Sequence, residues 1–258
     1  MSGTPSSQAP NINTTLPDEM LARIFLHLAA RHLPRVAEVC TRWQQVLDTP
    51  GFWSWVVFRV SRSNLASMPE RLDCRRLQGV RKLEVEAGWQ NGACGVAWRV
   101  EVSEKLLQAV AGHPGLRELD MSGTDLSRVE PELLASTLSK MEEVNLWYTE
   151  LTPRQASIFC QVLKDNTHLK SLQLGDVDLS RVEPELLAGA VAKLEEVNLS
   201  NTSLTNLQAR ALCQVLKENS HLKMMDLRGN KLSGVEAGLM EDSRLIIDCF
   251  GDDYDRLW

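Results

Sequence analysis

The sequence lacks an excess of basic residues. Its 28 Lys and Arg residues are outnumbered by 34 Asp and Glu residues, which gives a formal net charge of −6. Nucleic-acid-binding proteins neutralise phosphates with a basic surface, so this balance argues against nucleic acid and favours proteins as partners. At 258 residues, 43% of them hydrophobic and 24% charged, the chain has enough apolar material to bury a core.

Cysteine is sparse, and its spacing forms neither CxxC pairs nor metal-type Cys/His patterns. The six positions are Cys40, Cys74, Cys94, Cys160, Cys213 and Cys249. A disulfide framework is therefore not expected, and we predict a reducing compartment, cytoplasmic and/or nuclear.

Long hydrophobic runs are also missing. The longest, LLAGAVA at 186–192, is far too short to span a bilayer, so no membrane contact is expected. The first fifteen residues are small and polar, without the basic region and apolar run of a secretory signal.

The sequence offers little for an enzyme. It has no Gly-rich phosphate-binding loop, and its five histidines do not form a recognisable site. Cys160 and Cys213 occupy one repeated position on an apolar helical stripe, which favours small core residues over nucleophiles. We expect no catalytic residue, no metal site and no cofactor.

What the sequence does contain is repetition. The string DLSRVEPELLA at 125–135 returns unchanged at 178–188, 53 residues later. Each 53-residue period holds two shorter units with the skeleton LxxLxLxxxxL. Five are clear, beginning in steps of 25, 28, 25 and 28 residues at Leu116, Met141, Leu169, Leu194 and Leu222. A fixed period of this length indicates a stacked array.

Each unit changes period midway. The L-x-L segment alternates as a half-buried strand does, and the following segment spaces apolar residues three and four apart, as a helix does. In TNLQARALCQVLKEN we expect Thr205 to cap a helix that ends near Asn219. Its buried stripe is predicted to be Leu207, Ala211, Leu212, Val215 and Leu216.

This skeleton resembles the leucine-rich repeat, in its intracellular, helix-backed variety. The resemblance implies an α/β fold, a solenoid with parallel strands on a concave face and helices on a convex face. Weaker units fit Val80-Leu83-Val85 and Trp55-Phe58-Val60, and RLIIDC at 244–249 fits a last strand. We therefore predict eight strands and seven to eight units over 55–258, with an inserted loop near 88–98 that holds Trp89 and Trp98.

One position departs from the family pattern. Asn is usual two residues before the last Leu of the skeleton, where its side chain bonds to neighbouring backbone. This chain has Thr124, Thr149, Val177, Thr202 and Asn230 there. Because valine cannot form such a bond, we expect a local break or a bound water near Val177.

The segment before the repeats has the pattern of a helical hairpin. Leu16, Met20, Leu21, Ile24, Phe25 and Leu28 share one helical face, with Pro17 at the first turn. A second helix is predicted to present Leu33, Val36, Ala37, Val39, Cys40, Trp43 and Leu47. A hairpin this small cannot bury all its apolar residues, so part of its surface is expected to meet a partner.

This segment resembles the F-box, matching Leu16-Pro17-x-Glu19, Ile24-Phe25-x-x-Leu28, Val39-Cys40-x-Arg42-Trp43, and the closing Pro50 and Trp53. The resemblance implies docking on the Skp adaptor of an SCF-type cullin–RING ubiquitin ligase. It implies that the adaptor-binding or supporting residues are Leu16, Pro17, Ile24, Leu28, Val39, Cys40 and Trp43. For Phe25 and Trp53, core and docking roles both stay open. The predicted domains are a tail at 1–13, the F-box at 14–54 and the repeats, joined without a linker.

Residues that alternate with the buried strand positions should point into the concave face. Many are acidic and Trp147 lies among them, so we expect a protein substrate with a basic segment and an apolar contact, although carboxylates that only keep the solenoid soluble are the alternative. The predicted substrate-binding residues are Glu118, Asp120, Glu143, Asn145, Trp147, Tyr148, Gln173, Asn198 and Asp226.

The function expected from both segments is a non-catalytic substrate-recognition subunit of the ligase. The alternative is a leucine-rich-repeat scaffold or inhibitor, in which the hairpin serves only as an N-terminal cap.

Overall fold

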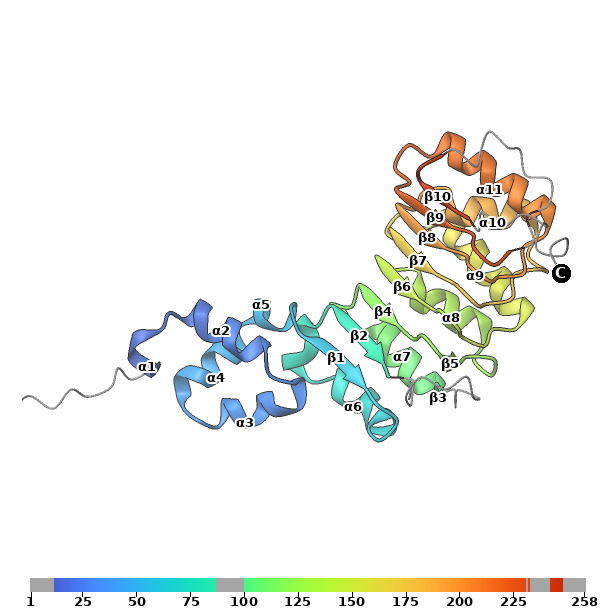
Figure 1. The fold of residues 1–258 in the computed structure, drawn as a ribbon. Helices are drawn as coiled ribbons and strands as arrows, with labels where there is room; N and C mark the ends of the chain where they lie inside the picture. Colours follow the sequence, from blue (N-terminus) through green and yellow to red (C-terminus); the bar gives the residue numbers. More distant parts are fainter. Residues whose placement is uncertain (1–11, 87–99, 231, 233–241, 248–258) are drawn as a thin grey trace, which may run out of the picture.

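The computed structural model describes residues 12–86, 100–230, 232 and 242–247 of the chain. Within this part the chain forms a small helical region at the N-terminal end and a curved array of strands and helices after it (Figure 1). The predicted inserted loop at 88–98, with Trp89 and Trp98, lies outside the described residues, as do most of the predicted 1–13 tail and the end of the last predicted strand.

The N-terminal region consists of short helices. They are α1 (Ile12–Thr15), α2 (Asp18–Leu26), the 3-10 helix η1 (Ala30–His32), α3 (Leu33–Ala37), α4 (Thr41–Asp48) and α5 (Pro50–Trp53). The prediction of one continuous second helix is wrong, because Cys40 is fully extended, with φ −163° and ψ 164°, and separates α3 from α4. Pro17 lies at the N-cap of α2 rather than inside its first turn.

Eight parallel strands form the main sheet, which confirms the predicted number. They are β1 (Val57–Val60), β2 (Lys82–Val85), β4 (Glu118–Asp120), β6 (Glu143–Asn145), β7 (Ser171–Gln173), β8 (Glu196–Asn198), β9 (Met224–Asp226) and β10 (Leu245–Ile246). Their spatial order is their order along the chain. A second, two-stranded sheet pairs β3 (Val100–Glu101) with β5 (Thr124–Asp125).

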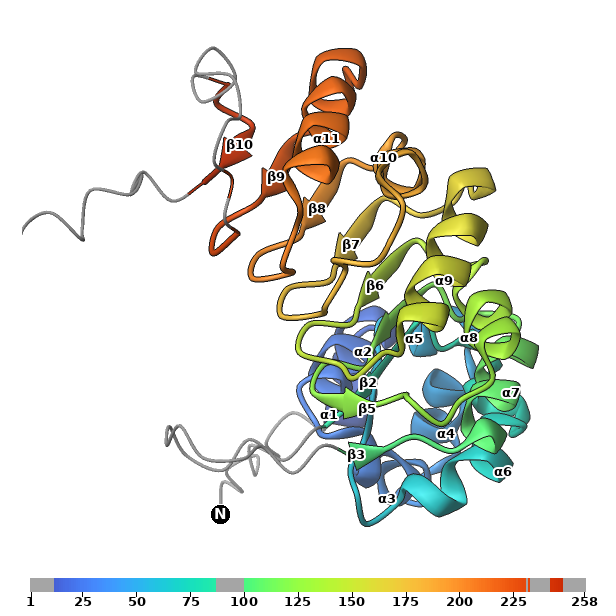
Figure 2. The same ribbon diagram turned by 90° about the vertical axis from the view of Figure 1, so that its right-hand side faces the viewer.

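Among the described residues, the helices lie on one side of the sheet and none covers its other face, which is here named the uncovered face (Figure 2). They are η2 (Leu65–Ser67), α6 (Met68–Leu72), η3 (Arg75–Gly79), α7 (Glu104–Gly112), α8 (Pro131–Leu138), α9 (Pro153–Asp165), α10 (Pro184–Val191) and α11 (Asn206–Glu218). Helix length explains the alternating steps, since α8 and α10 have 8 residues and α9 and α11 have 13. Within the described residues, no helix combines the length and apolar character needed to cross a membrane.

The capping predictions hold for α11. The Thr205 hydroxyl accepts a hydrogen bond from the backbone of Gln208 in a capping box, and Asn219 is the C-cap. The predicted buried stripe contains one error, because Leu207 is 64% exposed. Gln208 is buried in its place, and its amide donates to the carbonyls of Leu179 and Val182 in the preceding unit.

The core lies between the sheet and the helices and is built from aligned strand residues. Leu119, Val144, Leu172 and Val197 pair in register on successive strands, and each is buried. Burial of such a side chain stabilises the fold by about 1.5–3 kcal/mol. A single unit could not bury it, because the neighbouring units supply part of the enclosing surface. The same hydrophobic cluster runs on into the N-terminal helices, so the two regions share one core.

Of the two outcomes expected near Val177, a local break or a bound water, the local break does not occur. The Val177 amide donates to Leu174 O at 3.1 Å, as Thr149 N does to Leu146 O in the preceding unit. On either side, Asp176 N donates to Ser200 O and Leu179 N donates to Thr202 O, so the backbone ladder continues past the valine. Val177 itself is buried, and packing takes the place of the side-chain bond.

The first unit differs from its prediction at Trp55, which was expected to be a buried strand anchor. Its side chain is 77% exposed, while Val56, Phe58 and Val60 are buried. Trp55 precedes β1 and lines a surface groove together with residues of the N-terminal helices.

Candidate functional site

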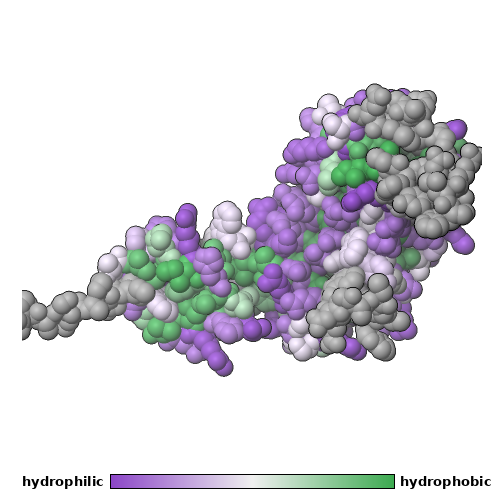
Figure 3. All heavy atoms as spheres, viewed as in Figure 1, coloured by the Kyte–Doolittle hydropathy of each residue, from purple (hydrophilic) through white to green (hydrophobic). Residues whose placement is uncertain are grey.

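The N-terminal helices leave a row of apolar side chains exposed. Met20, Ile24, Leu28 and Val39, here named the docking stripe, are between 41% and 57% exposed. Figure 3 shows hydrophobic residues gathered over this end of the molecule, whereas the visible face of the sheet is mostly hydrophilic. An exposed apolar group of this kind makes the region a candidate interaction surface.

The other predicted adaptor-binding residues belong to the same helical region. Pro17 is exposed, whereas Leu16, Cys40 and Trp43 are half-buried. For Phe25 and Trp53, the structure selects the core role. The Phe25 ring lies 5.0 Å from the Trp43 ring, and the Trp53 indole donates to Leu47 O at 2.6 Å.

Arg42 holds the start of this region in place, a role that the sequence analysis did not assign. Its guanidinium donates to Asp18 Oδ1 at 2.8 Å, to Leu16 O at 2.5 Å and to Asn13 O. The planar fork thus ties α4 to the chain on both sides of Pro17. The sequence signal that could have indicated this role is the position of Arg42 in the Cys40-x-Arg42-Trp43 pattern.

An apolar groove of about 610 Å³ lies on another side of α2. It is lined by Ala22, Leu26, Val46, Phe52 and Trp55, with Asp18, Glu19 and Arg23 at its polar edge. The sequence analysis missed this groove because it placed Trp55 in the core.

The uncovered face of the sheet carries the predicted substrate-binding residues. The alternation holds, since Glu118, Asp120, Glu143, Asn145, Gln173 and Asn198 are exposed or half-buried around buried neighbours. Trp147 is 36% exposed, and its ring centroid lies 6.0 Å from that of Tyr148. Asp226 is the exception: it is 3% exposed, because Arg228 covers it with a 2.6 Å ion pair.

Several of these side chains also stabilise the turn after each strand. The Oδ1 atoms of Asp120, Asn145, Asn198 and Asp226 each accept the amide two residues later, at 2.9–3.0 Å. The turn then passes through a residue with positive φ at one repeated position. These residues are Gly123, Tyr148, Asp176, Asn201 and Gly229. The same Asp and Asn side chains therefore shape the face as well as line it.

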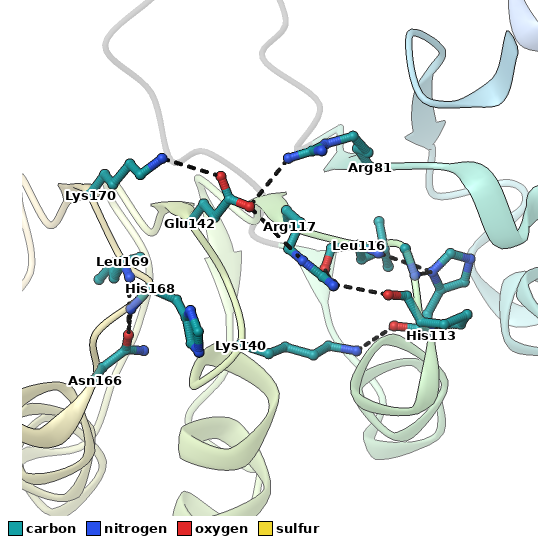
Figure 4. Close-up of polar contacts among 12 residues, drawn as sticks. Arg81, His113, Leu116, Arg117, Lys140, Glu142, Asn166, His168, Leu169 and Lys170 are labelled. Atoms are coloured by element: carbon teal, nitrogen blue, oxygen red, sulfur yellow. Dashed lines mark hydrogen bonds and ion pairs between the residues drawn. The ribbon is translucent and has the colours of Figure 1, made fainter. Parts of the chain in front are cut away.

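The face is less acidic in effect than its composition suggested, because the chain pairs many of its own carboxylates. Arg59 lies 3.2 Å from Glu84, and Lys82 lies 3.6 Å from Glu118. Directly before β6, Glu142 lies between Arg81 at 3.2 Å and Lys170 at 3.6 Å (Figure 4). Most exposed pairs of this kind contribute little stability, but they reduce the field available to a ligand.

Cys160 and His113 are two buried side chains of the repeats that carry titratable groups. Burial raises the pKa of the Cys160 thiol to about 12, so it stays protonated and unreactive at neutral pH. His113 is buried and bonded to backbone. Among the described residues, no cluster of three or more His, Cys, Asp or Glu side chains is arranged to hold a metal ion.

Comparison with known proteins identifies both parts of the chain. Residues 14–59 match a family model described as F-box-like. The chain is 30% identical over 155 residues to ribonuclease inhibitor of Sus scrofa, covering 57% of this chain and 34% of that protein. It is 35% identical over 130 residues to leucine-rich repeat-containing protein 14 of Bos taurus, covering 49% of this chain and 26% of that protein.

The name of a third relative refers to both an F-box and leucine-rich repeats. F-box/LRR-repeat protein 5 of Danio rerio is 26% identical over 195 residues, covering 72% of this chain and 27% of that protein. The chain therefore spans about a third or less of the length of these relatives. An F-box-like domain at 14–59, followed by parallel strands and helices in leucine-rich-repeat order, makes this chain an F-box/LRR protein.

Proposed function

We propose that this protein is the substrate-recognition subunit of an SCF-type cullin–RING E3 ubiquitin ligase. In this proposal the F-box-like domain docks on the Skp adaptor, and the uncovered face of the repeats binds a substrate protein. The chain performs no reaction itself, because transfer of ubiquitin belongs to the assembled ligase.

The observation that carries the proposal is the docking stripe. Four apolar side chains stay exposed on a domain that matches the F-box-like family. Two of them, Met20 and Ile24, lie on α2, the helix whose Leu21 and Phe25 are buried. Covering these side chains with a partner would remove apolar surface from water, at about 25 cal/mol per Å².

The shared core gives the proposal a mechanical basis. Phe52, Trp53 and Val56 belong to the same hydrophobic cluster as Leu77 and Leu83 of the repeats, and α5 packs against η3. A substrate on the repeats would therefore be held at a fixed position relative to the adaptor, as a ligase that must present a lysine to its catalytic module requires.

Co-purification with the Skp adaptor tests the proposal. We expect the intact chain to form a stable complex, and Ile24→Ala combined with Val39→Ala to weaken it at least about tenfold, since each truncated contact is worth about 1 kcal/mol or more. Leu16→Ala with Pro17→Ala should act in the same direction. Leu207→Ala is the matched control, because Leu207 is equally apolar and exposed but lies on α11.

A second candidate is a leucine-rich-repeat scaffold or inhibitor with the hairpin as a cap. The observation in its favour is the similarity to a protein named ribonuclease inhibitor. A folded, intact chain that fails to bind the Skp adaptor would favour this second candidate over the ligase subunit.

A further inference from the structure

Three neighbouring strands present side chains in three aligned rows on the uncovered face. In the first row Glu143 pairs in register with Ser171, and Ser171 with Glu196. The second row, two residues later, is Asn145, Gln173 and Asn198. Two residues further along, the chain places Trp147, Gly175 and Ser200. We call these nine residues on and after β6, β7 and β8 the central grid.

The first row holds two carboxylates that the chain does not neutralise. Within the described part of the chain, neither Glu143 nor Glu196 has an ion-pair partner within 4.0 Å, in contrast to Glu84, Glu118 and Asp226 on the same face. The nearby lysines are already engaged, since Lys170 lies 3.6 Å from Glu142 and Lys223 lies 2.6 Å from Glu195. Glu196 does raise the pKa of Lys223, though less than Glu195 does.

The third row holds a flat aromatic surface. A Cβ atom added at Gly175 would lie 2.5 Å from Cδ1 of Trp147 and 2.9 Å from Oγ of Ser200. The indole therefore lies directly over Gly175 and reaches toward Ser200, and only glycine at this position leaves room for it. The Cδ1–Nε1 edge of the indole therefore covers Gly175, and 36% of Trp147 stays exposed.

We propose that the central grid binds an extended basic segment of the substrate protein. One Arg or Lys side chain would lie between Glu143 and Glu196, above Ser171, and an apolar side chain would lie on Trp147. This inference rests on the proposed function, because the bound segment is taken to belong to the substrate.

The geometry fixes the spacing of the two contacts. Glu143 and Glu196 are two strands apart, about 9.6 Å between backbones, which leaves room for one cationic group between their side chains. Along the strands, four residues separate the first row from the third, or about 13 Å. Residues i and i+4 of an extended segment span the same distance, and Gln173 between them presents an amide that can bond to the segment's backbone.

A displayed library of random twelve-residue peptides tests the inference, selected against the full chain, with and without the Skp adaptor. We expect the selected peptides to be enriched in Arg or Lys, with an apolar residue four positions away. Selection against Glu143→Gln/Glu196→Gln should lose the basic residues, and one selected peptide should bind this variant about tenfold more weakly in fluorescence anisotropy.

Two further variants separate charge from shape. Glu132→Gln/Glu185→Gln removes the same charge from exposed first turns of α8 and α10, and should leave the selection unchanged. Gly175→Ala should push the indole away while keeping both carboxylates, so the apolar preference should fall and the basic preference should remain. Thermal unfolding of each variant checks that it is folded.

Two outcomes would overturn the inference and leave the carboxylates as solubilising groups. One is that peptides selected against the intact chain are not enriched in Arg or Lys; the other is that this enrichment persists with Glu143→Gln/Glu196→Gln. Loss of adaptor binding with unchanged peptide selection would instead count against the ligase role alone.

Discussion

His113 makes with its imidazole the same hydrogen bonds that Asn219 makes with its amide. Nδ1 of His113 accepts the amides of Gly115 and Leu116 at 3.2 Å, and Nε2 donates to Leu77 O at 2.9 Å. Oδ1 of Asn219 accepts the amides of His221 and Leu222, and Nδ2 donates to Leu194 O at 2.9 Å. Both residues are the C-cap of a helix, and a strand begins five residues later. Figure 4 shows His113 together with Asn166, the C-cap of α9, which occupies the same position in a later repeat unit.

The equivalence predicts how position 113 responds to substitution. His113→Leu should lower the free energy of unfolding by about 2–3 kcal/mol, because it leaves two amides and a carbonyl without partners in a buried place. His113→Asn should cost about 1 kcal/mol, since it can restore the bonds to Gly115 and Leu116. Urea unfolding of the three proteins measures this, and equal stability of the Leu and Asn variants would contradict the equivalence.

The same site predicts a dependence of stability on pH. Burial lowers the pKa of His113, and the charges of Lys140 and Arg117 lower it further, against the bond to Leu77. Above about pH 6.5 the imidazole is neutral in both states, so its contribution is fully present. Below this pH the unfolded chain takes up a proton that the folded chain excludes, and the free energy of unfolding falls.

Comparison of two proteins isolates this effect from that of other titrating groups. Between pH 7.5 and 5.5, the intact chain should lose more stability than His113→Asn does. Parallel curves for the two proteins in urea unfolding would mean that His113 does not titrate differently on folding.

The two tryptophans around Ser54 should differ sharply. Trp53→Ala should cost about 3–5 kcal/mol, because the side chain is 7% exposed and fills the junction between the two regions. Trp55→Ala should change the free energy of unfolding by less than about 0.5 kcal/mol, since the side chain is 77% exposed. Thermal melts of the two variants give the comparison, and a large loss at Trp55 would place it in the core after all.

Cysteine reactivity should follow burial. In the folded protein at pH 8, Cys74 is exposed and should react readily with a thiol reagent, whereas Cys160 should not, because burial raises its pKa to about 12. Mass spectrometry of peptides after brief alkylation measures both sites. Denaturant should remove the difference, and fast labelling of native Cys160 would show that α9 opens.

Arg42 should support the docking surface from beneath. Arg42→Lys keeps the charge but loses the planar fork that holds Leu16 O and Asp18 together, so we expect Skp adaptor binding to weaken by several-fold, about 1 kcal/mol. Asp18→Asn, which keeps an acceptor for Arg42, serves as the control. Titration calorimetry of the adaptor complex would distinguish the two, and unchanged binding by Arg42→Lys would remove it from this role.

Much of the repeat architecture could be predicted from local patterns. The L-x-L alternation located all eight strands of the main sheet, and Thr205 located the start of α11. These features depend on residues close together in sequence, whose period and capping chemistry are visible without a structure. The errors fell where long-range contacts decide, as at Leu207, which shares the helical period but faces solvent, and at Cys40, where the chain is extended between two helices.

The sequence by itself determined the stack of strand-helix units, the apolar residues of the F-box-like segment, and the excess of acidic over basic residues. Only the tertiary structure decided which apolar residues stay uncovered and which carboxylates stay unpaired. Ile24 and Phe25 are adjacent in the chain and both are large and apolar, yet Ile24 is 43% exposed and Phe25 only 2%. The difference arises because Trp43 packs on Phe25, whereas none of the described residues covers Ile24 to the same extent. Glu142 and Glu143 are likewise adjacent residues of the same type. Among the described residues, however, basic side chains of neighbouring units form ion pairs with Glu142 and not with Glu143.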